Sequence, residues 1–221
     1  MKLAKLTYFV LFVFYSMSSF AEKSFFKDIS NLLPDQKPRL SYGVAVTDFD
    51  NDGSDEFIVT GFGYENLALG YDGSSLKNKI KENIFSDFNR STIGVAACDI
   101  DKDGHEEIYF LNTDTYSGQK MYSDRLLKLV DKNIEDLFEK DINQDELNLT
   151  AGRSVVCVDR EGKGNYGIYV ANYGGPTRVY EYIDNREVDL AESLKLDEIT
   201  GGRGGVAGHL GADQVDSCAA D

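Results

Sequence analysis

A loop of closely spaced carboxylates occurs twice in this chain and constrains its fold more than any other feature. The copies are residues 48–56 and 99–107, and each has acidic residues at loop positions 1, 3, 5 and 9 and glycine at position 6. Carboxylates this close repel one another unless a cation lies among them, and calcium accepts about six to eight oxygen ligands. The pattern predicts two calcium loops. A polar hairpin turn is the alternative, but the repeated spacing favours calcium.

The residues around the loops distinguish them from an EF-hand. An EF-hand needs a bidentate Glu at position 12 and a helix on each side, whereas position 12 here is Val59 or Phe110. Short runs rich in β-branched and aromatic residues flank both loops, which is typical of strands. We therefore expect each loop to connect the two strands of a β-hairpin. The flanking runs are 43–47, 56–60, 93–98 and 107–111.

The predicted calcium ligands are the four spaced carboxylates of each loop and the main-chain carbonyl at position 7, with water completing each shell. The neighbouring Asp55 and Glu106 are expected to face solvent, and the imidazole of His105 is expected to be a free surface group. The full set is Asp48, Asp50, Asp52, Ser54 (carbonyl) and Glu56 in the first loop, and Asp99, Asp101, Asp103, His105 (carbonyl) and Glu107 in the second.

A third, degraded copy of the loop begins at Asp159. It keeps an acidic residue at position 3, Glu161, but has Lys163 at position 5 and Gly167 at position 9. The ammonium of Lys163 can itself neutralise the remaining carboxylates. We therefore expect this loop to keep the turn and to bind no metal.

The spacing between the copies predicts the architecture. The first two copies begin 51 residues apart and the next two 60 residues apart. Periods of this length, with about four strands each, are typical of propeller blades. We therefore predict an all-β fold, a partial β-propeller with about three four-stranded blades and the start of a fourth. The predicted units are about 38–88, 89–149, 150–200 and an incomplete 201–221.

Two segments need the repeat context for their interpretation. Residues 126–137 also fit one face of a helix, but their place in the repeat favours a strand. Residues 24–29 have the composition of the last strand of a unit whose other strands are absent. Propellers often use such an N-terminal strand to complete a blade, so a strand is expected there.

The N-terminus has the features of a secretory signal peptide over residues 1–21. Lys2 and Lys5 precede an apolar stretch at 9–15, and Ser19-Phe20-Ala21 forms a small-x-small cleavage site. The apolar stretch is too short for a comfortable membrane span, so none is expected after cleavage. The chain is therefore predicted to be secreted and extracellular, or periplasmic or at the cell surface if its source is bacterial.

The net charge, the cysteines and the glycosylation sequons bear on which partners the chain can bind and how it can be covalently modified. The formal net charge of −15 excludes nucleic acid, because phosphate binding needs basic clusters. Cys98 and Cys157 precede the second and third loops, and either form a disulfide or are small buried residues; Cys218 remains over. Two sequons, at Asn89 and Asn148, could carry glycans if the source is eukaryotic.

Four segments carry a resemblance to a known family: 93–101, 106–112, 151–160 and 200–204. They resemble the FG-GAP/VCBS repeat proteins, whose integrin-type propellers carry calcium loops on hairpins, and most closely the cartilage acidic protein family. The resemblance covers about residues 24–216, and implies a secreted calcium-binding propeller that contacts an extracellular protein or glycan. Members of that family have more blades, so we expect the chain to be truncated, either as a shorter isoform, as a frameshifted sequence or as a fragment.

The sequence gives little indication of an enzyme. His105 and His209 have no recognisable nucleophile motif nearby, and the cysteine spacing does not fit zinc. The glycine-rich residues 201–205 lack the Lys-Ser/Thr of a phosphate-binding loop and fit a tight turn. We therefore expect an interaction or adhesion module without enzymatic activity. The alternative is the propeller portion of a secreted polysaccharide- or ester-active enzyme.

Overall fold

A computed structural model describes residues 26–33, 38–209 and 215–220. Contacts within the chain divide it into two units, residues 1–32 and 33–221, and each is described by itself. The signal peptide predicted over residues 1–21 lies outside the described residues. None of the helices within the described ranges has the length and apolar character that crossing a membrane requires.

The first unit does not contain the predicted N-terminal strand in its described part. Residues 26–29 are irregular and lead into the short 3-10 helix η1 (Ser30–Leu32). The carboxylate of Asp28 accepts a hydrogen bond of 2.8 Å from the backbone N–H of Ser30, and Leu32 N–H donates to Ile29 O. These local bonds favour a turn, and the side chain of Phe26 is 90% exposed. The strand prediction for residues 26–29 was wrong, because apolar composition alone does not supply a neighbouring strand; residues 24 and 25 are not described.

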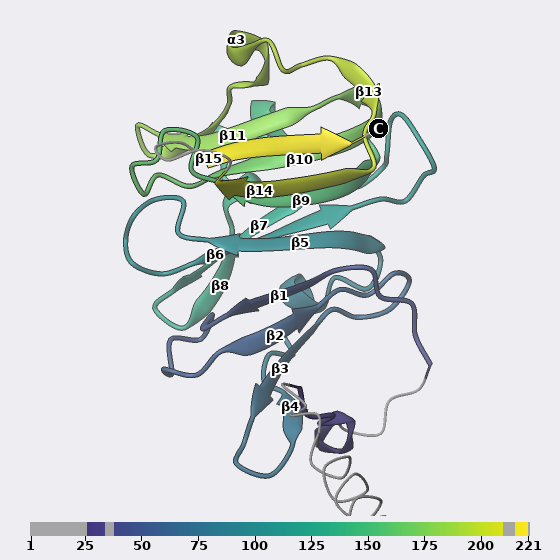
Figure 1. Ribbon diagram of the computed structural model, residues 1–221, viewed down its shortest axis with the longest axis vertical. Helices are drawn as coiled ribbons and strands as arrows, with labels where there is room; N and C mark the ends of the chain where they lie inside the picture. Colours follow the sequence, from purple (N-terminus) through teal and green to yellow (C-terminus); the bar gives the residue numbers. More distant parts are fainter. Residues whose placement is uncertain (1–25, 34–37, 210–214, 221) are drawn as a thin grey trace, which may run out of the picture. The chain divides into compact units, whose positions relative to one another are not determined.

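Within its described residues, the second unit contains three antiparallel sheets that each include four consecutive strands, and we call these groups of four strands blades 1, 2 and 3 (Figure 1). Strand order follows chain order in each blade, and the predicted all-β, blade-like fold is confirmed. Blade 1 consists of β1 (Val44–Thr47), β2 (Glu56–Val59), β3 (Leu67–Tyr71) and β4 (Leu76–Asn78); blade 2 of β5 (Thr92–Cys98), β6 (Glu107–Asn112), β7 (Arg125–Val130) and β8 (Asn133–Asp136); blade 3 of β9 (Gly152–Val158), β10 (Gly167–Pro176), β11 (Arg178–Ile183) and β12 (Arg186–Asp189).

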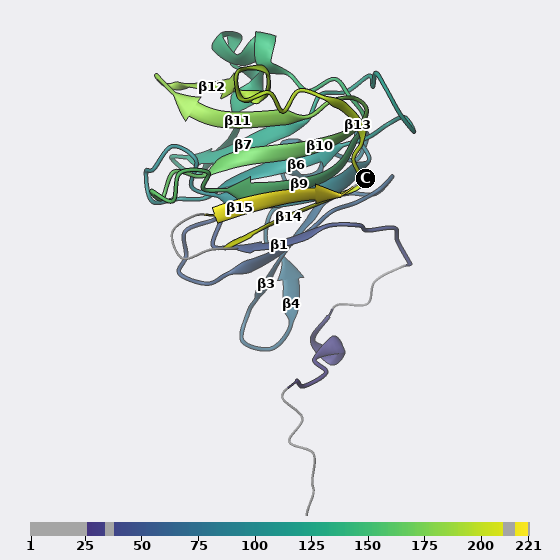
Figure 2. The ribbon, with the colours of Figure 1, turned by 45° about the horizontal axis from the view of Figure 1, so that its top comes forward.

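Three further strands follow the blades. The strand β13 (Ile199–Gly201) pairs with the C-terminal part of β10, and so belongs to the sheet of blade 3. A hairpin of β14 (Gly204–His209) and β15 (Val215–Ala220) then lies beside β9, as Figure 2 shows. The remaining short helices are α2 (Asn83–Ser86), η2 (Leu137–Glu139), η3 (Asp141–Glu146) and α3 (Ala191–Leu194).

The first strands of successive blades lie next to one another. Strand β1 contacts β5, β5 contacts β9, and β9 contacts β14. The hydroxyl oxygen of Ser154 on β9 accepts a hydrogen bond of 3.0 Å from the N–H of Gly205 on β14. Successive blades therefore contact each other along their first strands.

Two apolar layers hold the blades together. The layer between blades 1 and 2 contains Phe49, Ile58 and Phe110, and the layer between blades 2 and 3 contains Tyr109 and Tyr180. Because successive side chains of a strand point to opposite faces, β6 supplies residues to both layers, and all six of its residues are buried. The segment that also fitted a helix forms two paired strands, 125–130 and 133–136. Successive residues of the first strand, Leu126 and Leu127, enter opposite layers, as the alternation of a strand requires.

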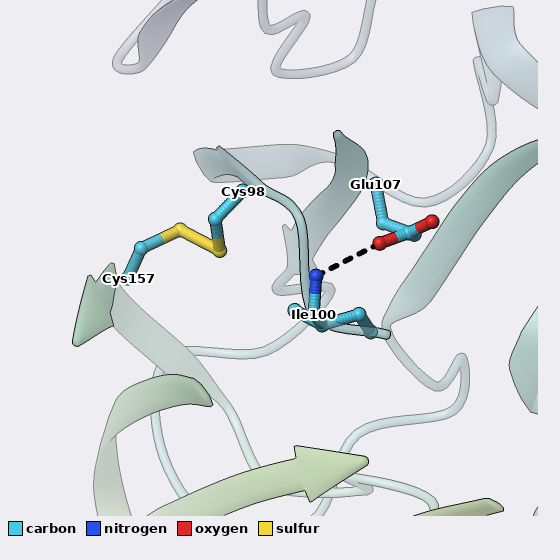
Figure 3. The surroundings of a disulfide bond; sticks show 4 residues. All are labelled: Cys98, Ile100, Glu107 and Cys157. Atoms are coloured by element: carbon cyan, nitrogen blue, oxygen red, sulfur yellow. Dashed lines mark hydrogen bonds between the residues drawn. A yellow bond between two sulfur atoms is a disulfide. The ribbon is translucent and has the colours of Figure 1, made fainter. Parts of the chain in front are cut away.

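A disulfide joins two neighbouring blades. Cys98, the last residue of β5, is bonded to Cys157 of β9, with 6.3 Å between their Cα atoms (Figure 3). Of the two alternatives left by the sequence, the structure contains the bond. Cys218 lies in β15 opposite Val206, and its side chain is outside the described part of the structure.

Candidate metal centre

The three loops that connect the first two strands of each blade have the same shape. Each hairpin closes on an equivalent pair, Thr47 with Glu56, Cys98 with Glu107, and Val158 with Gly167. The residues at loop positions 4 and 6 are in the left-handed region in every copy, which explains the glycine at position 6. Their φ angles are 56° and 88° at Asn51 and Gly53, 64° and 90° at Lys102 and Gly104, and 65° and 73° at Gly162 and Gly164.

The aspartate at position 1 holds the loop in this shape. Asp48 accepts hydrogen bonds from the backbone N–H groups of Asp52 at 3.0 Å and Gly53 at 2.9 Å. Asp99 accepts the corresponding bond from Gly104 at 3.0 Å. The first carboxylate of the motif therefore has a structural role besides the predicted one, because it binds the backbone of the turn as an Asx turn does.

In blade 1 the loop brings Asp48, Asp50 and Glu56 together. One carboxylate oxygen of each lies within 4.8 Å of the others. The side chain of Glu56 is completely buried, and neither of its oxygens has a hydrogen-bond partner in the described part of the chain. Burial, together with the charges of Asp50 and Asp52, raises the pKa of Glu56 to about 7. An unpaired buried carboxylate next to two others fits a site that is completed by a cation.

Asp52, the predicted ligand at position 5, lies outside that group of three. Its Oδ2 atom is 3.6 Å from the ammonium nitrogen of Lys79, and its Oδ1 accepts a hydrogen bond from the N–H of Ser54. The next residue, Asp55, is exposed. The described contacts therefore place three of the four predicted carboxylates of this loop around one point.

In blade 2 the equivalent residues Asp99, Asp101 and Glu107 come together in the same way. Glu107 is buried, and its Oε2 accepts a hydrogen bond of 3.0 Å from the N–H of Ile100 (Figure 3). The Oδ1 atom of Asp99 is buried without a partner in the described residues. Burial raises the pKa of Glu107, and its hydrogen bond with Lys128 opposes this.

Lys128 is a member of the blade 2 site that the sequence analysis missed. Its ammonium nitrogen lies 2.6 Å from Asp101 Oδ2, 2.7 Å from Asp103 Oδ2 and 2.8 Å from Glu107 Oε1. Ile108 pairs with Leu127, so Lys128 follows in register beside Glu107. The available signal was a single lysine within the apolar strand 125–130.

The loop of blade 3 is neutralised by its own cations. The ammonium nitrogen of Lys163 lies 2.7 Å from Glu161 Oε2, as the sequence predicts. Arg160 of the loop has its Nη2 atom 3.5 Å from Glu161 Oε1, and its Nε donates to Glu181 Oε1 of β11 at 2.9 Å. The loop keeps the turn, since Asp159 accepts backbone hydrogen bonds from Lys163 and Gly164 as Asp48 does in blade 1.

The loops of blades 1 and 2 contact each other through His105. Its Nδ1 atom lies 2.7 Å from Oδ1 of Asn51, so this nitrogen carries the proton and donates. The ring is exposed, in agreement with the expected surface position, and the structure adds a contact with Asn51 of the neighbouring blade.

The two sequons differ in access. Asn89 is exposed. The side chain of Asn148 is buried, and its amide donates to Asp124 Oδ2 at 2.6 Å and to Asn172 Oδ1 at 3.1 Å. In the folded chain, therefore, the second sequon is not an accessible glycan acceptor.

Comparison with known proteins agrees with this arrangement of blades and loops. The sequence model of the FG-GAP-like repeat matches residues 48–110, from the first carboxylate loop into β6. Cartilage acidic protein 1 of Xenopus tropicalis is 40% identical over 207 residues, covering 83% of this chain and 31% of the relative. The human protein of the same name is 40% identical over 219 residues, covering 86% and 33%, and that of Mus musculus is 42% identical over 193 residues, covering 79% and 30%. The chain thus spans about a third of the length of these relatives. The chain is therefore similar to the FG-GAP-like repeat from its first carboxylate loop into β6, and to about a third of cartilage acidic protein 1 over most of its own length.

Proposed function

We propose that the chain is the calcium-binding propeller part of a secreted protein and works as an extracellular interaction or adhesion module. The observation that carries the calcium assignment is Glu56: a fully buried carboxylate, unpaired among the described residues, beside Asp48 and Asp50. Such a group is costly unless it is protonated or meets a cation. Carboxylate oxygens are the ligands that calcium prefers.

Asp48, Asp50 and Glu56 would hold calcium in blade 1, and Asp99, Asp101 and Glu107 in blade 2. Asp52, Asp103 and the carbonyls of loop position 7 are additional candidate ligands. Each bound ion would supply two positive charges among carboxylates that otherwise repel one another. Because position 1 follows the first strand and position 9 begins the second, the ion would fasten the end of each hairpin.

Four observations support secretion and contact with other molecules. The Cys98–Cys157 disulfide is typical of oxidising compartments outside the cytosol. The sequence begins with a signal-like segment, and the charge of −15 suits calcium-rich surroundings. The similarity to cartilage acidic protein 1 favours the same class of role. The partner that fits these features is an extracellular protein or glycan.

The test compares thermal unfolding of the chain in millimolar calcium and in chelator, for the wild type, Glu56→Gln and Asp55→Asn. Both variants lose one negative charge from the same loop, but only Glu56 is buried. Calcium at a hundredfold its dissociation constant stabilises a folded protein by about 2.7 kcal/mol per site. We expect calcium to stabilise the wild type and Asp55→Asn. In Glu56→Gln, the part of this stabilisation that comes from calcium at blade 1 is expected to be absent.

The behaviour in chelator distinguishes a lost ligand from a damaged fold. At pH 8 the buried Glu56 is ionised and unpaired, so replacing it by the neutral amide is expected to leave the calcium-free protein at least as stable. Wild-type unfolding that is indifferent to calcium would reduce both loops to polar turns and overturn the proposal.

A further inference from the structure

We propose that the ammonium group of Lys128 and a calcium ion are alternative occupants of the blade 2 loop, and that Glu187 receives the ammonium when calcium enters. This inference rests on the proposed function and adds to it a difference between the two loops. Blade 1 takes calcium directly, whereas blade 2 takes calcium only in exchange for its resident cation.

The position of Lys128 is the first argument. Its nitrogen lies 2.6–2.8 Å from oxygens of Asp101, Asp103 and Glu107, and its side chain is only 14% exposed. Calcium contacts carboxylate oxygens at about 2.3–2.6 Å. Two cations at such distances from the same oxygens repel each other strongly in a partly buried site. Calcium therefore needs the place that the ammonium occupies.

The interactions of Lys128 favour the charged form. Burial lowers the pKa of Lys128, but the hydrogen bonds to its three carboxylate partners outweigh burial, so its pKa lies above the ordinary value. Lys128 accordingly offsets one of the negative charges of the blade 2 loop without metal. Glu107 also accepts a hydrogen bond from Ile100 N–H, and at the equivalent place in blade 1 the backbone N–H of Phe49 lowers the pKa of Glu56. The backbone is therefore alike at both sites, and Lys128 is the difference between them.

The corresponding position in blade 1 has no side chain. Phe57 pairs with Leu69, so Gly70 stands beside Glu56 as Lys128 stands beside Glu107. A Cβ atom on Gly70 would lie 3.1 Å from Glu56 Oε1. The nearest lysine, Lys79, has its nitrogen 3.6 Å from Asp52. The two loops thus have the same turn and the same predicted carboxylates, but Lys79 contacts only Asp52 at the edge of blade 1, whereas Lys128 lies among three carboxylates of blade 2.

Glu187 of blade 3 is the second difference between the sites. Glu187 lies on β12 and pairs with Tyr182 of β11. The corresponding residue of blade 2 is Ile134 of β8, which pairs with Leu129 of β7. Ile134 packs against the apolar layer between blades 1 and 2. Glu187 is 1% exposed, and neither carboxylate oxygen has a partner within the described chain.

Glu187 lies on the face of blade 3 that is turned toward the blade 2 loop. Cross-strand partners share a face of the sheet, and Tyr182, the partner of Glu187 on β11, lines one cavity together with Ile100 and Asp101 of that loop. Burial raises the pKa of Glu187 to about 8, the charges of Glu107 and Asp101 add to the increase, and Lys128 opposes it. An ammonium that leaves the loop needs another buried acceptor, because an unpaired charge is unfavourable there. The blade 2 site thus has a lysine and a neighbouring buried glutamate that the blade 1 site lacks. Gly70 of blade 1 corresponds to Lys128, and Ile134 of blade 2 corresponds to Glu187. This pairing assigns Glu187 as the acceptor.

Calcium titration calorimetry on the chain with the blade 1 loop silenced by Asp50→Asn and Glu56→Gln tests the exchange. In this background we expect Lys128→Met to tighten calcium binding at blade 2 at least tenfold. The matched control is Lys132→Met, which removes the same charge from an exposed turn and is expected to change affinity less than threefold. Equal affinities for Lys128→Met and its parent, or no calcium binding by Lys128→Met, would overturn the exchange.

Glu187→Gln provides an independent arm that keeps Lys128. We expect it to weaken calcium binding at blade 2 several-fold, and to have no effect once Lys128 is Met. The exposed Glu192→Gln is its control. Unchanged affinity in Glu187→Gln would overturn the role of Glu187. If Lys128→Met folds only with calcium, this rescue supports the exchange, and Glu187→Gln still measures it.

The proposed function can fail separately. A chain with blade 2 silenced by Asp101→Asn and Glu107→Gln reports on blade 1 alone. Absence of calcium binding there would contradict the calcium assignment itself. Binding at blade 1 without any response of blade 2 to Lys128→Met would contradict only the exchange.

Discussion

At the scale of single residues, the carboxylates differ in how each is neutralised. Glu56 is buried without a described partner, Glu107 has a lysine and a backbone N–H, and Glu161 has Lys163. The spacing of the sequence predicted Asp48, Asp50 and Glu56 because all three belong to one nine-residue loop. It could not predict Lys128 or Glu187, which reach the site from other strands and whose proximity depends on sheet register.

Calcium binding at blade 1 is expected to release a proton below neutral pH. Without calcium the pKa of Glu56 in the folded chain is about 7, above its ordinary value of 4.5. The protonated form therefore stabilises the calcium-free fold fully below pH 4.5, and this contribution is lost as pH rises through 7. Calcium needs the ionised form, so its affinity for blade 1 should rise with pH up to about 7.

Titration calorimetry in buffers of different ionisation enthalpy measures this proton release. With blade 2 silenced by Asp101→Asn and Glu107→Gln, about 0.9 proton per calcium is expected at pH 6 and about 0.1 at pH 8. The same proton count at both pH values would show that Glu56 is not the group that calcium ionises.

At the scale of elements, the hairpin is the unit that repeats. Its loop has left-handed residues at positions 4 and 6 in all three blades. The charges differ: Glu56 of blade 1 has no described hydrogen-bond partner, Glu107 of blade 2 pairs with Lys128 of β7, and Glu161 of blade 3 pairs with Lys163 of its own loop. Local sequence predicted these hairpins because turn residues and β-branched runs lie close together in the chain. Residues 26–29 failed as a strand because pairing depends on a neighbour that local sequence does not reveal.

The disulfide is expected to stabilise the chain independently of calcium. Its cysteines are 59 residues apart, and closing a loop of that length in the unfolded chain is worth about 4 kcal/mol in the chain-entropy model. The double variant Cys98→Ala/Cys157→Ala should therefore lose about 2–4 kcal/mol of unfolding free energy in urea, in calcium and in chelator alike. Cys218→Ala is the control, since it removes a cysteine outside this bond. A double variant as stable as this control would contradict the expectation.

At the scale of the molecule, each described blade packs against the blade that precedes or follows it in the chain. The two apolar layers and the Cys98–Cys157 bond connect adjacent blades, and β6 has both faces buried because it lies between two layers. The repeat period predicted the number of blades. Alternation along the strands indicates that each has an apolar face. That β6 has both faces buried depends on the packing of three blades, which local sequence does not reveal.

The bond between Cys98 and Cys157 also decides how the chain would extend under tension. Pulling on both ends transmits force through the disulfide and bypasses the residues between the two cysteines, which include β6, β7, β8 and the blade 2 loop. With 59 residues of separation, roughly 200 Å of contour length stays hidden. Single-molecule stretching should therefore show an added extension of about this length after reduction. In the oxidised chain under load, the blade 2 loop with Lys128 would be shielded from the applied force, while blade 1 would bear it.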